Sequence, residues 1–121
     1  MKYVPKSQAK KVDIGAGDVL EYNLGDPDID GAVATLNGNY PASGFVVNED
    51  VKELLYVISG RGKLITRDES VELNQGDEAL IEKGELFRYE DCEELVLLAA
   101  CTPAWTAEQH KEVRDINRLT P

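Results

Sequence analysis

Apolar residues in this chain fall in short runs, and turn-forming residues separate the runs. The runs are rich in Val, Ile, Leu and Tyr, which favour β-strands. Gly, Asn, Asp and Pro lie between them, for example at 25–28 and 74–77. The runs are found at 17–22, 32–36, 45–47, 54–58, 62–66, 70–73, 78–81, 86–89 and 95–100. Many short strands separated by turns predict an all-β sandwich or barrel.

Two of these runs do not alternate between apolar and polar positions. Residues 54–58 and 95–100 are apolar at consecutive positions, which indicates strands covered on both faces. In the wall of a barrel the inner face lines the interior, so the outer face needs another cover. We therefore predict a homodimer, with the outer face around Tyr56 and Ile58 and the N-terminal segment in the contact.

The end of the chain has a helical pattern. Thr106 and Gln109 have the spacing of a capping box, and Val113, Ile116 and Leu119 follow as a thin apolar stripe. This pattern predicts a short C-terminal helix over about 106–118.

Length and charge limit the class of protein. The chain has 121 residues, which suits one domain spanning 1–121. Its formal net charge is 13 − 23 = −10, which argues against nucleic acid and anionic membranes as partners. Residues 1–6 lack the apolar segment of a signal peptide. Two cysteines, Cys92 and Cys101, are typical of a reduced protein, so we predict a cytoplasmic location and buried thiols.

Two spacings resemble the signatures of the cupin family. Gly76 is followed after five residues by Glu82, Lys83 and Gly84, then by Phe87 and Asp91 at the intervals of the second cupin signature. Glu53 precedes Gly60 by the interval found in the first signature. The resemblance implies a cupin-type double-stranded β-helix, a jelly-roll barrel, with its core at about 30–102.

The resemblance also places the positions at which cupins bind metal. They fall on Val46, Asn48, Glu53 and Phe87, so Glu53 alone is a residue of the usual ligand set. Moving the first pair by one residue still supplies no imidazole, and the chain has one histidine. We therefore expect no metal and no cofactor.

A strand register with Glu53 and Phe87 facing inward defines a predicted pocket, since side chains alternate along a strand. Leu54, Tyr56 and Arg88 then face outward. The predicted wall consists of Asn48, Glu53, Leu55, Val57, Leu80, Phe87 and Tyr89.

Several residues have two interpretations. Glu53 is either a buried binding group with a raised pKa or a hydrated carboxylate at the end of a strand. Phe87 and Tyr89 either plug the barrel or stack on a ligand. Tyr40 and Trp105 are lid aromatics or packing residues. His110, on the expected helix, is predicted to lie at the surface or in a dimer contact.

With the resemblance, the sequence predicts a metal-independent, small-molecule-binding cupin whose ligand is a sugar or small polar metabolite. A neutral or cationic ligand is favoured over a phosphate ester, because the predicted wall has no Lys or Arg. Two alternatives stay open. One is a metal-free sugar isomerase or epimerase whose acid and base are Glu53 and a tyrosine. The other is a degenerate cupin that acts as a structural or interaction module.

Overall fold

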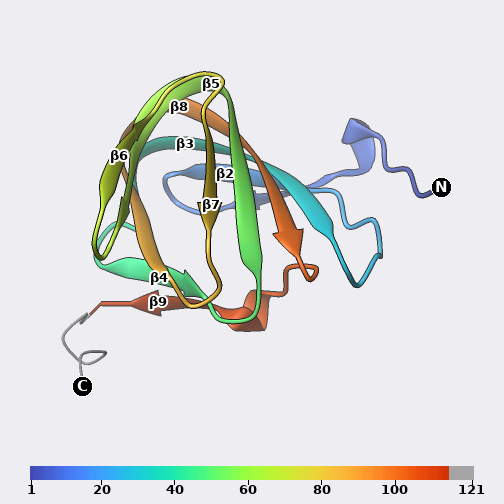
Figure 1. The fold of residues 1–121 in the computed structure, drawn as a ribbon. Helices are drawn as coiled ribbons and strands as arrows, with labels where there is room; N and C mark the ends of the chain where they lie inside the picture. The colour runs from blue at the N-terminus through green and yellow to red at the C-terminus, as the bar shows by residue number, and fades with distance from the viewer. Residues whose placement is uncertain (115–121) are drawn as a thin grey trace.

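The computed structural model describes residues 1–114 and shows a curled antiparallel sheet (Figure 1). Two 3-10 turns, η1 (Lys6–Gln8) and η2 (Ala107–Gln109), accompany the strands. The strands are β1 (Lys10–Asp13), β2 (Gly17–Glu21), β3 (Asp30–Tyr40), β4 (Phe45–Asn48), β5 (Lys52–Thr66), β6 (Ser70–Leu73), β7 (Glu78–Ile81), β8 (Leu86–Thr102) and β9 (His110–Val113). The all-β prediction is confirmed.

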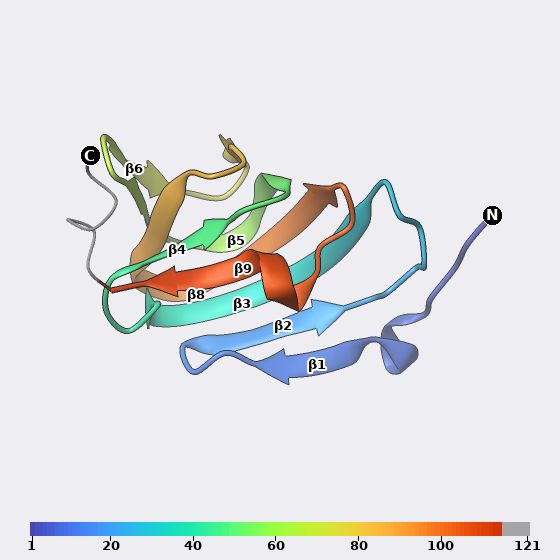
Figure 2. The same cartoon turned by 90° about the horizontal axis from the view of Figure 1, so that it is seen from below.

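Strand β8 is the centre of the sheet. The strand order is β1-β2-β3-β8-β4-β9, and β5 pairs with β8 while carrying β6 and β7. Figures 1 and 2 show that the sheet bends round, with β5, β6 and β7 on one side and β4 and β9 on another. No helix within residues 1–114 is long and apolar enough to cross a membrane.

The two long strands each replace two predicted ones. The runs 54–58 and 62–66 are parts of β5, and 86–89 and 95–100 are parts of β8. The β5–β8 register shifts between Val57 and Lys63, so the turn signals there mark β-bulges. Gly60 has φ +77°, and a Cβ at this position would run into the backbone of β8. Glycine is therefore needed where the two strands bend together.

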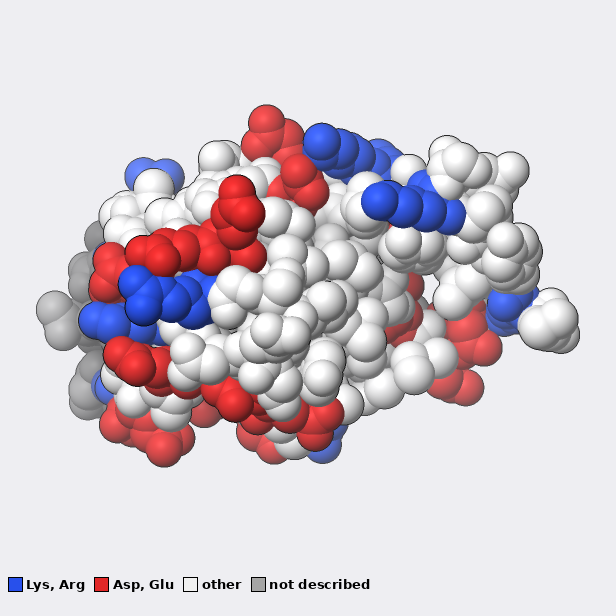
Figure 3. Space-filling model, turned by 90° about the horizontal axis from the view of Figure 1, so that it is seen from above, with Lys and Arg blue, Asp and Glu red and all other residues white. Residues whose placement is uncertain are grey.

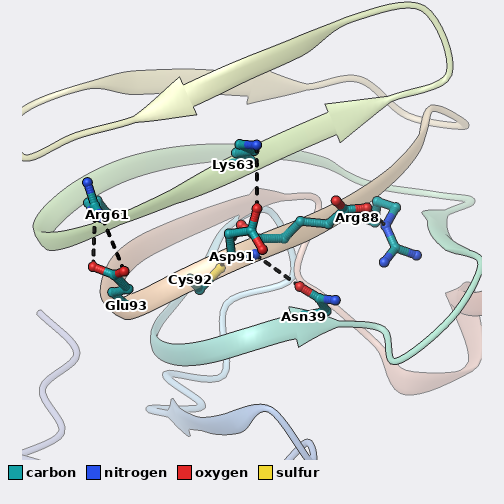
Figure 4. Close-up of polar contacts among 8 residues, drawn as sticks. Asn39, Arg61, Lys63, Arg88, Asp91, Cys92 and Glu93 are labelled. Atoms are coloured by element: carbon teal, nitrogen blue, oxygen red, sulfur yellow. Dashed lines mark hydrogen bonds and ion pairs between the residues drawn. The ribbon is translucent and has the colours of Figure 1, made fainter.

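The bulge on β8 is held from both neighbouring strands (Figure 4). The backbone N–H of Asp91, which has φ +52°, donates to Oδ1 of Asn39 at 3.0 Å. On the β5 side, Arg61 pairs with Glu93 at 2.8 Å and Lys63 pairs with Asp91 at 3.4 Å. These ion pairs are exposed, and solvent-exposed ion pairs contribute little to stability, so the asparagine bond and the glycine geometry matter more for the bend.

Burial follows the alternation along β5. Leu55 and Val57 are each 1% exposed, while Leu54, Tyr56 and Ile58 are 41–43% exposed. The outward orientation predicted for Leu54 and Tyr56 is therefore what the structure shows. The buried side chains on the inner face join those of β3, β4, β7 and β8 in one core.

The predicted C-terminal helix is wrong for the residues that the structure describes. Residues 107–109 form the turn η2, and β9 pairs with β4 from Phe45↔Val113 to Asn48↔His110. Thr106 makes no side-chain cap bond, and the thin apolar stripe gives a helix little to bury. Strand pairing instead satisfies the backbone along β4. The remainder of the predicted helix, 115–118, lies outside the described residues.

Candidate functional site

The concave side of the sheet contains a cavity of about 250 Å³. Its wall is mostly apolar and is built from β1 to β3, β5, β8 and the segment that carries Trp105 and His110. Small residues of β3 and β8, namely Gly31, Ala32, Ala34 and Ala99, leave the central space open. The polar groups in the wall are Glu21, Asp30, Tyr40, Glu53, Tyr89, Cys101 and His110.

A buried asparagine connects the polar groups from behind. Asn48, at the end of β4, is fully buried. Its Nδ2 donates to Oε1 of Glu53 at 3.2 Å, and its Oδ1 accepts from Nε2 of Gln109 at 3.1 Å. Nδ1 of His110 lies 2.8 Å from the same Oδ1. Because Asn48 and His110 are register partners on β4 and β9, the strand pairing itself brings these groups together.

Glu53 presents a carboxyl group to the cavity. Burial raises the pKa of Glu53, and the bonds from Asn48 and Cys101 oppose this rise. Both of those donors approach Oε1, with the Cys101 thiol at 3.7 Å. Oε2 has no hydrogen-bond partner among residues 1–114. Glu53 can therefore offer this oxygen to a ligand, as a donor or as an acceptor.

Tyr40 and His110 form a polar pair that is flanked by aromatic side chains. Oη of Tyr40 lies 3.0 Å from Nε2 of His110, and their rings are nearly parallel, 7° apart. The Trp105 ring centre is 5.8 Å from that of His110. Burial lowers the pKa of His110, which favours the neutral ring. Burial, together with Glu112 and Glu53, raises the pKa of Tyr40, which favours the neutral phenol.

Tyr89 contributes a second phenol. Its side chain is 4% exposed, lines the cavity and packs edge-on against Phe87 at 5.9 Å between ring centres. Burial raises the pKa of Tyr89 well above its usual range. Its hydroxyl has no hydrogen-bond partner within the described part of the chain. No fully enclosed side-chain N or O atom of the described residues lacks a partner, so the Tyr89 oxygen itself is open to the cavity. This hydroxyl is therefore available to a ligand.

The structure brings together four of the seven residues predicted for the wall. Glu53, Leu55, Phe87 and Tyr89 line the cavity, while Asn48 lies directly behind it. Val57 is buried in the core and does not line the cavity.

The placement of Leu80 in the pocket is wrong. Leu80 is 49% exposed, whereas the next residue, Ile81, is 1% exposed. Leu80 is the register partner of Leu54 across β5 and β7, and cross-strand partners share a face. Since Leu54 was expected to face outward, the pairing of its strand would have placed Leu80 outside as well.

The prediction for His110 is also wrong, because this residue lines the cavity. The prediction followed from the expected helix, which would have carried the imidazole away from the barrel. Tyr40 and Trp105 both line the cavity. Glu21 and Asp30 also line the cavity but were not predicted. The residues next to them in the sequence do not indicate that their side chains face inward.

The residues at the expected metal positions do not fit a metal ion. Val46 and Phe87 supply no ligand atom, and the Asn48 oxygen is occupied by Gln109 and His110. Among residues 1–114, no three His, Cys, Asp or Glu side chains form a group that could hold a metal.

Solved structures similar to this chain have the cupin fold. Pac13 from Streptomyces, a nucleoside dehydratase, is 17% identical with a TM-score of 0.83, over 94% of this chain and 92% of its own. Ectoine synthase from P. lautus is 12% identical with a TM-score of 0.73, over 93% and 90%. A cupin-2 domain protein from Shewanella frigidimarina is 20% identical with a TM-score of 0.54, over 60% and 69%.

No protein-family model matches the sequence, and the comparison with curated proteins found no match. The structural likeness confirms the expected fold. At such low identities it does not carry an activity from those proteins to this one.

Proposed function

We propose that this cupin-fold protein binds a small, uncharged, hydroxyl-bearing molecule, such as a nucleoside or a sugar, without a metal. The observation that carries the proposal is the unpaired hydroxyl of Tyr89, which lines the same mostly apolar cavity as the carboxyl group of Glu53. Ligand sites combine apolar walls with a few polar groups that fix orientation.

The charges of the wall support the same ligand class. Glu21, Asp30 and Glu53 are carboxylic, and none of the described residues lining the cavity is Lys or Arg. A phosphate ester requires cationic groups or a helix N-terminus. The cavity therefore favours a neutral or cationic ligand over an anionic one.

The comparisons supply a suitable chemical example. Variants of Pac13 in which a tyrosine or a histidine is replaced were solved with uridine. A nucleoside combines a flat ring with sugar hydroxyls, and the cavity here combines Phe87, Tyr89 and Trp105 with Glu53 and Tyr40. Stacking and hydrogen bonding could then act on different parts of one ligand.

A thermal-shift and calorimetry panel tests the ligand class. We expect at least one nucleoside or free sugar to raise the melting temperature, because a ligand that binds only the native state stabilises it. The phosphorylated form of the same compound should bind at least about tenfold more weakly, a difference of about 1.4 kcal/mol. Tight binding of the phosphorylated member, or of none of the neutral members, would contradict the proposal.

A metal-free acid–base enzyme, with an isomerase or epimerase as one example, is the second candidate. It is favoured by the 3.0 Å contact of Tyr40 with His110 near a carboxyl group of raised pKa. Paired groups of this kind are suited to proton transfer. Conversion of a bound sugar or nucleoside, followed by NMR and lost in Tyr40→Phe, would favour the enzyme. Binding without conversion would favour the first candidate.

We also propose that two copies pair through the outer face of β5 and β8. Leu54, Tyr56, Ile58, Leu80 and Leu98 are each at least 41% exposed. They form one surface, because Tyr56 is the register partner of Leu98 and Leu54 that of Leu80. Figure 3 shows a broad uncharged area over this side of the molecule, with charged residues around it. Such patches commonly mark protein interfaces, and twofold homodimers are the commonest assembly.

Light scattering tests this assembly. The protein should have twice the mass of the 13.4 kDa chain at micromolar concentration, and Tyr56→Glu should shift it to the monomer. Ile29→Glu is the matched control, because Ile29 is 53% exposed but lies on the β2–β3 connection. A monomeric mass for the unchanged protein would refute the proposal.

A further inference from the structure

The hydrogen bonds behind the cavity run in one direction, and a backbone group sets that direction. The N–H of Asp50 donates to Oε1 of Gln109 at 3.2 Å. A backbone N–H can only donate, so the oxygen of the Gln109 amide must face Asp50. The nitrogen of that amide then faces Asn48 and donates to its Oδ1. Asn48 is thereby oriented, with Nδ2 toward Glu53.

The orientation of Asn48 determines the protonation of His110. Nδ1 of His110 lies 2.8 Å from Oδ1 of Asn48, an acceptor, so Nδ1 carries a proton. The buried ring is neutral, since burial lowers the pKa of His110, and a neutral imidazole has one N–H. Nε2 is therefore unprotonated and carries a lone pair, and the hydroxyl of Tyr40 donates a hydrogen bond to it.

Because the Tyr40 hydroxyl already donates its proton to His110, it can only accept a hydrogen bond from a ligand in the cavity. Tyr89 differs, because its hydroxyl proton has no acceptor among the described residues. The two phenols of the same cavity thus have opposite capacities: Tyr40 accepts, whereas Tyr89 can also donate.

We propose that Asn48 fixes His110 as the Nδ1–H tautomer and so makes Tyr40 an obligate acceptor, which selects ligands that present a hydroxyl donor at this point. This inference rests on the proposed binding of a neutral, hydroxyl-bearing ligand. Asn48 is a positioning residue, since it lies behind the wall and acts through His110. It occupies a position at which the family resemblance implies a metal ligand, and here it orients an imidazole supplied by the neighbouring strand β9.

The tautomer can be measured without any ligand, because His110 is the one histidine of the chain. In ¹⁵N-labelled protein at pH 7 to 8, Nδ1 should show the shift and coupling of a protonated nitrogen, and Nε2 those of an unprotonated one. A protonated Nε2 over that range would overturn the proposal. The result does not depend on whether the proposed ligand binds.

Two variants of similar size separate positioning from packing. Asn48→Asp keeps an acceptor for Nδ1–H, so the tautomer should persist, and the added carboxyl should move the His110 titration upward. Asn48→Leu removes the acceptor, so the Nδ1–H tautomer should no longer dominate. The groups that face His110 are Asn48 from β4, Tyr40 from β3, Phe87 from β8, Trp105, and Glu112 on β9, and Glu53 lines the same cavity. Identical tautomers in both folded variants would overturn the role of Asn48.

Paired ligands test the selectivity. Uridine and simple free sugars are compared by calorimetry with their fully O-methylated forms, which keep the acceptors and lose the hydroxyl donors. The free forms should bind at least about tenfold more tightly, and Tyr40→Phe should reduce this ratio. Equal or tighter binding of the methylated forms would overturn the selectivity. Binding of neither form would contradict the proposed function and leave the NMR result as the test of the tautomer.

Discussion

Replacing Ala99 with leucine should abolish ligand binding and leave the protein folded. Ala99 lies on β8 in the cavity wall, with Ala32 opposite it on β3. Leucine at this position would place three further carbons in a space of about 250 Å³. Since cavity-filling substitutions commonly stabilise by about 0.5–2 kcal/mol, the melting temperature should stay level or rise. Binding should fall by more than about 100-fold, which corresponds to about 2.7 kcal/mol.

The adjacent residue offers a matched control. Ala100 is the same residue type on the same strand, but it does not line the cavity, as expected for the opposite face of a strand. Ala100→Leu should leave the affinity for the nucleoside or sugar unchanged. Equal losses in both variants, or none in Ala99→Leu, would show that the cavity is not the binding site.

The fold was predictable wherever local patterning and tertiary pairing agree. Strands β6 and β7 have the predicted bounds, 70–73 and 78–81, because alternation and flanking turn residues act over a few positions. The strands around 54–66 and 86–102 were predicted as pairs of shorter strands. Gly60 and Asp91 both have positive φ, and β-bulges and turns favour the same residue types at such positions. Sequence alone does not distinguish the two.

The candidate site was predictable where it follows from the register of one strand. Glu53 with Leu55, and Phe87 with Tyr89, are pairs two residues apart, and each pair faces the cavity. Leu80 failed because its face depends on the pairing of β5 with β7. His110 failed because the pairing of β9 with β4 outweighs a helix signal that had little apolar surface to support it. Contacts between distant strands decided both outcomes.

Replacing Glu53 with glutamine should stabilise the ligand-free protein at neutral pH and weaken its binding. Burial raises the pKa of Glu53 above the value of 4.5 expected in an unfolded chain. Between these two values the folded state holds a proton that the unfolded state has lost. The contribution of Glu53 to stability is therefore fully present below about pH 4.5 and is lost as the pH rises through the folded-state pKa.

Glutamine retains the volume and an acceptor for Asn48 and Cys101, and it does not ionise. The melting temperatures of the two proteins should be nearly equal at pH 4, and the variant should be higher by about 3–6 °C at pH 7.5. Glu82→Gln is the control, because Glu82 is exposed and pairs with Lys52 at the surface. A difference that stays constant with pH would show that the ionisation of Glu53 does not limit stability.

The same variant should lose affinity for the neutral ligand by about tenfold or more, since the carboxyl oxygen Oε2 that faces no partner within residues 1–114 is replaced. A stability gain combined with a binding loss is the behaviour expected of a group retained for function. If Glu53→Gln binds the nucleoside or sugar as tightly as the unchanged protein, Glu53 is a structural carboxyl group and the ligand is held by Tyr40 and Tyr89. Calorimetry on both proteins at pH 7.5 decides between these outcomes.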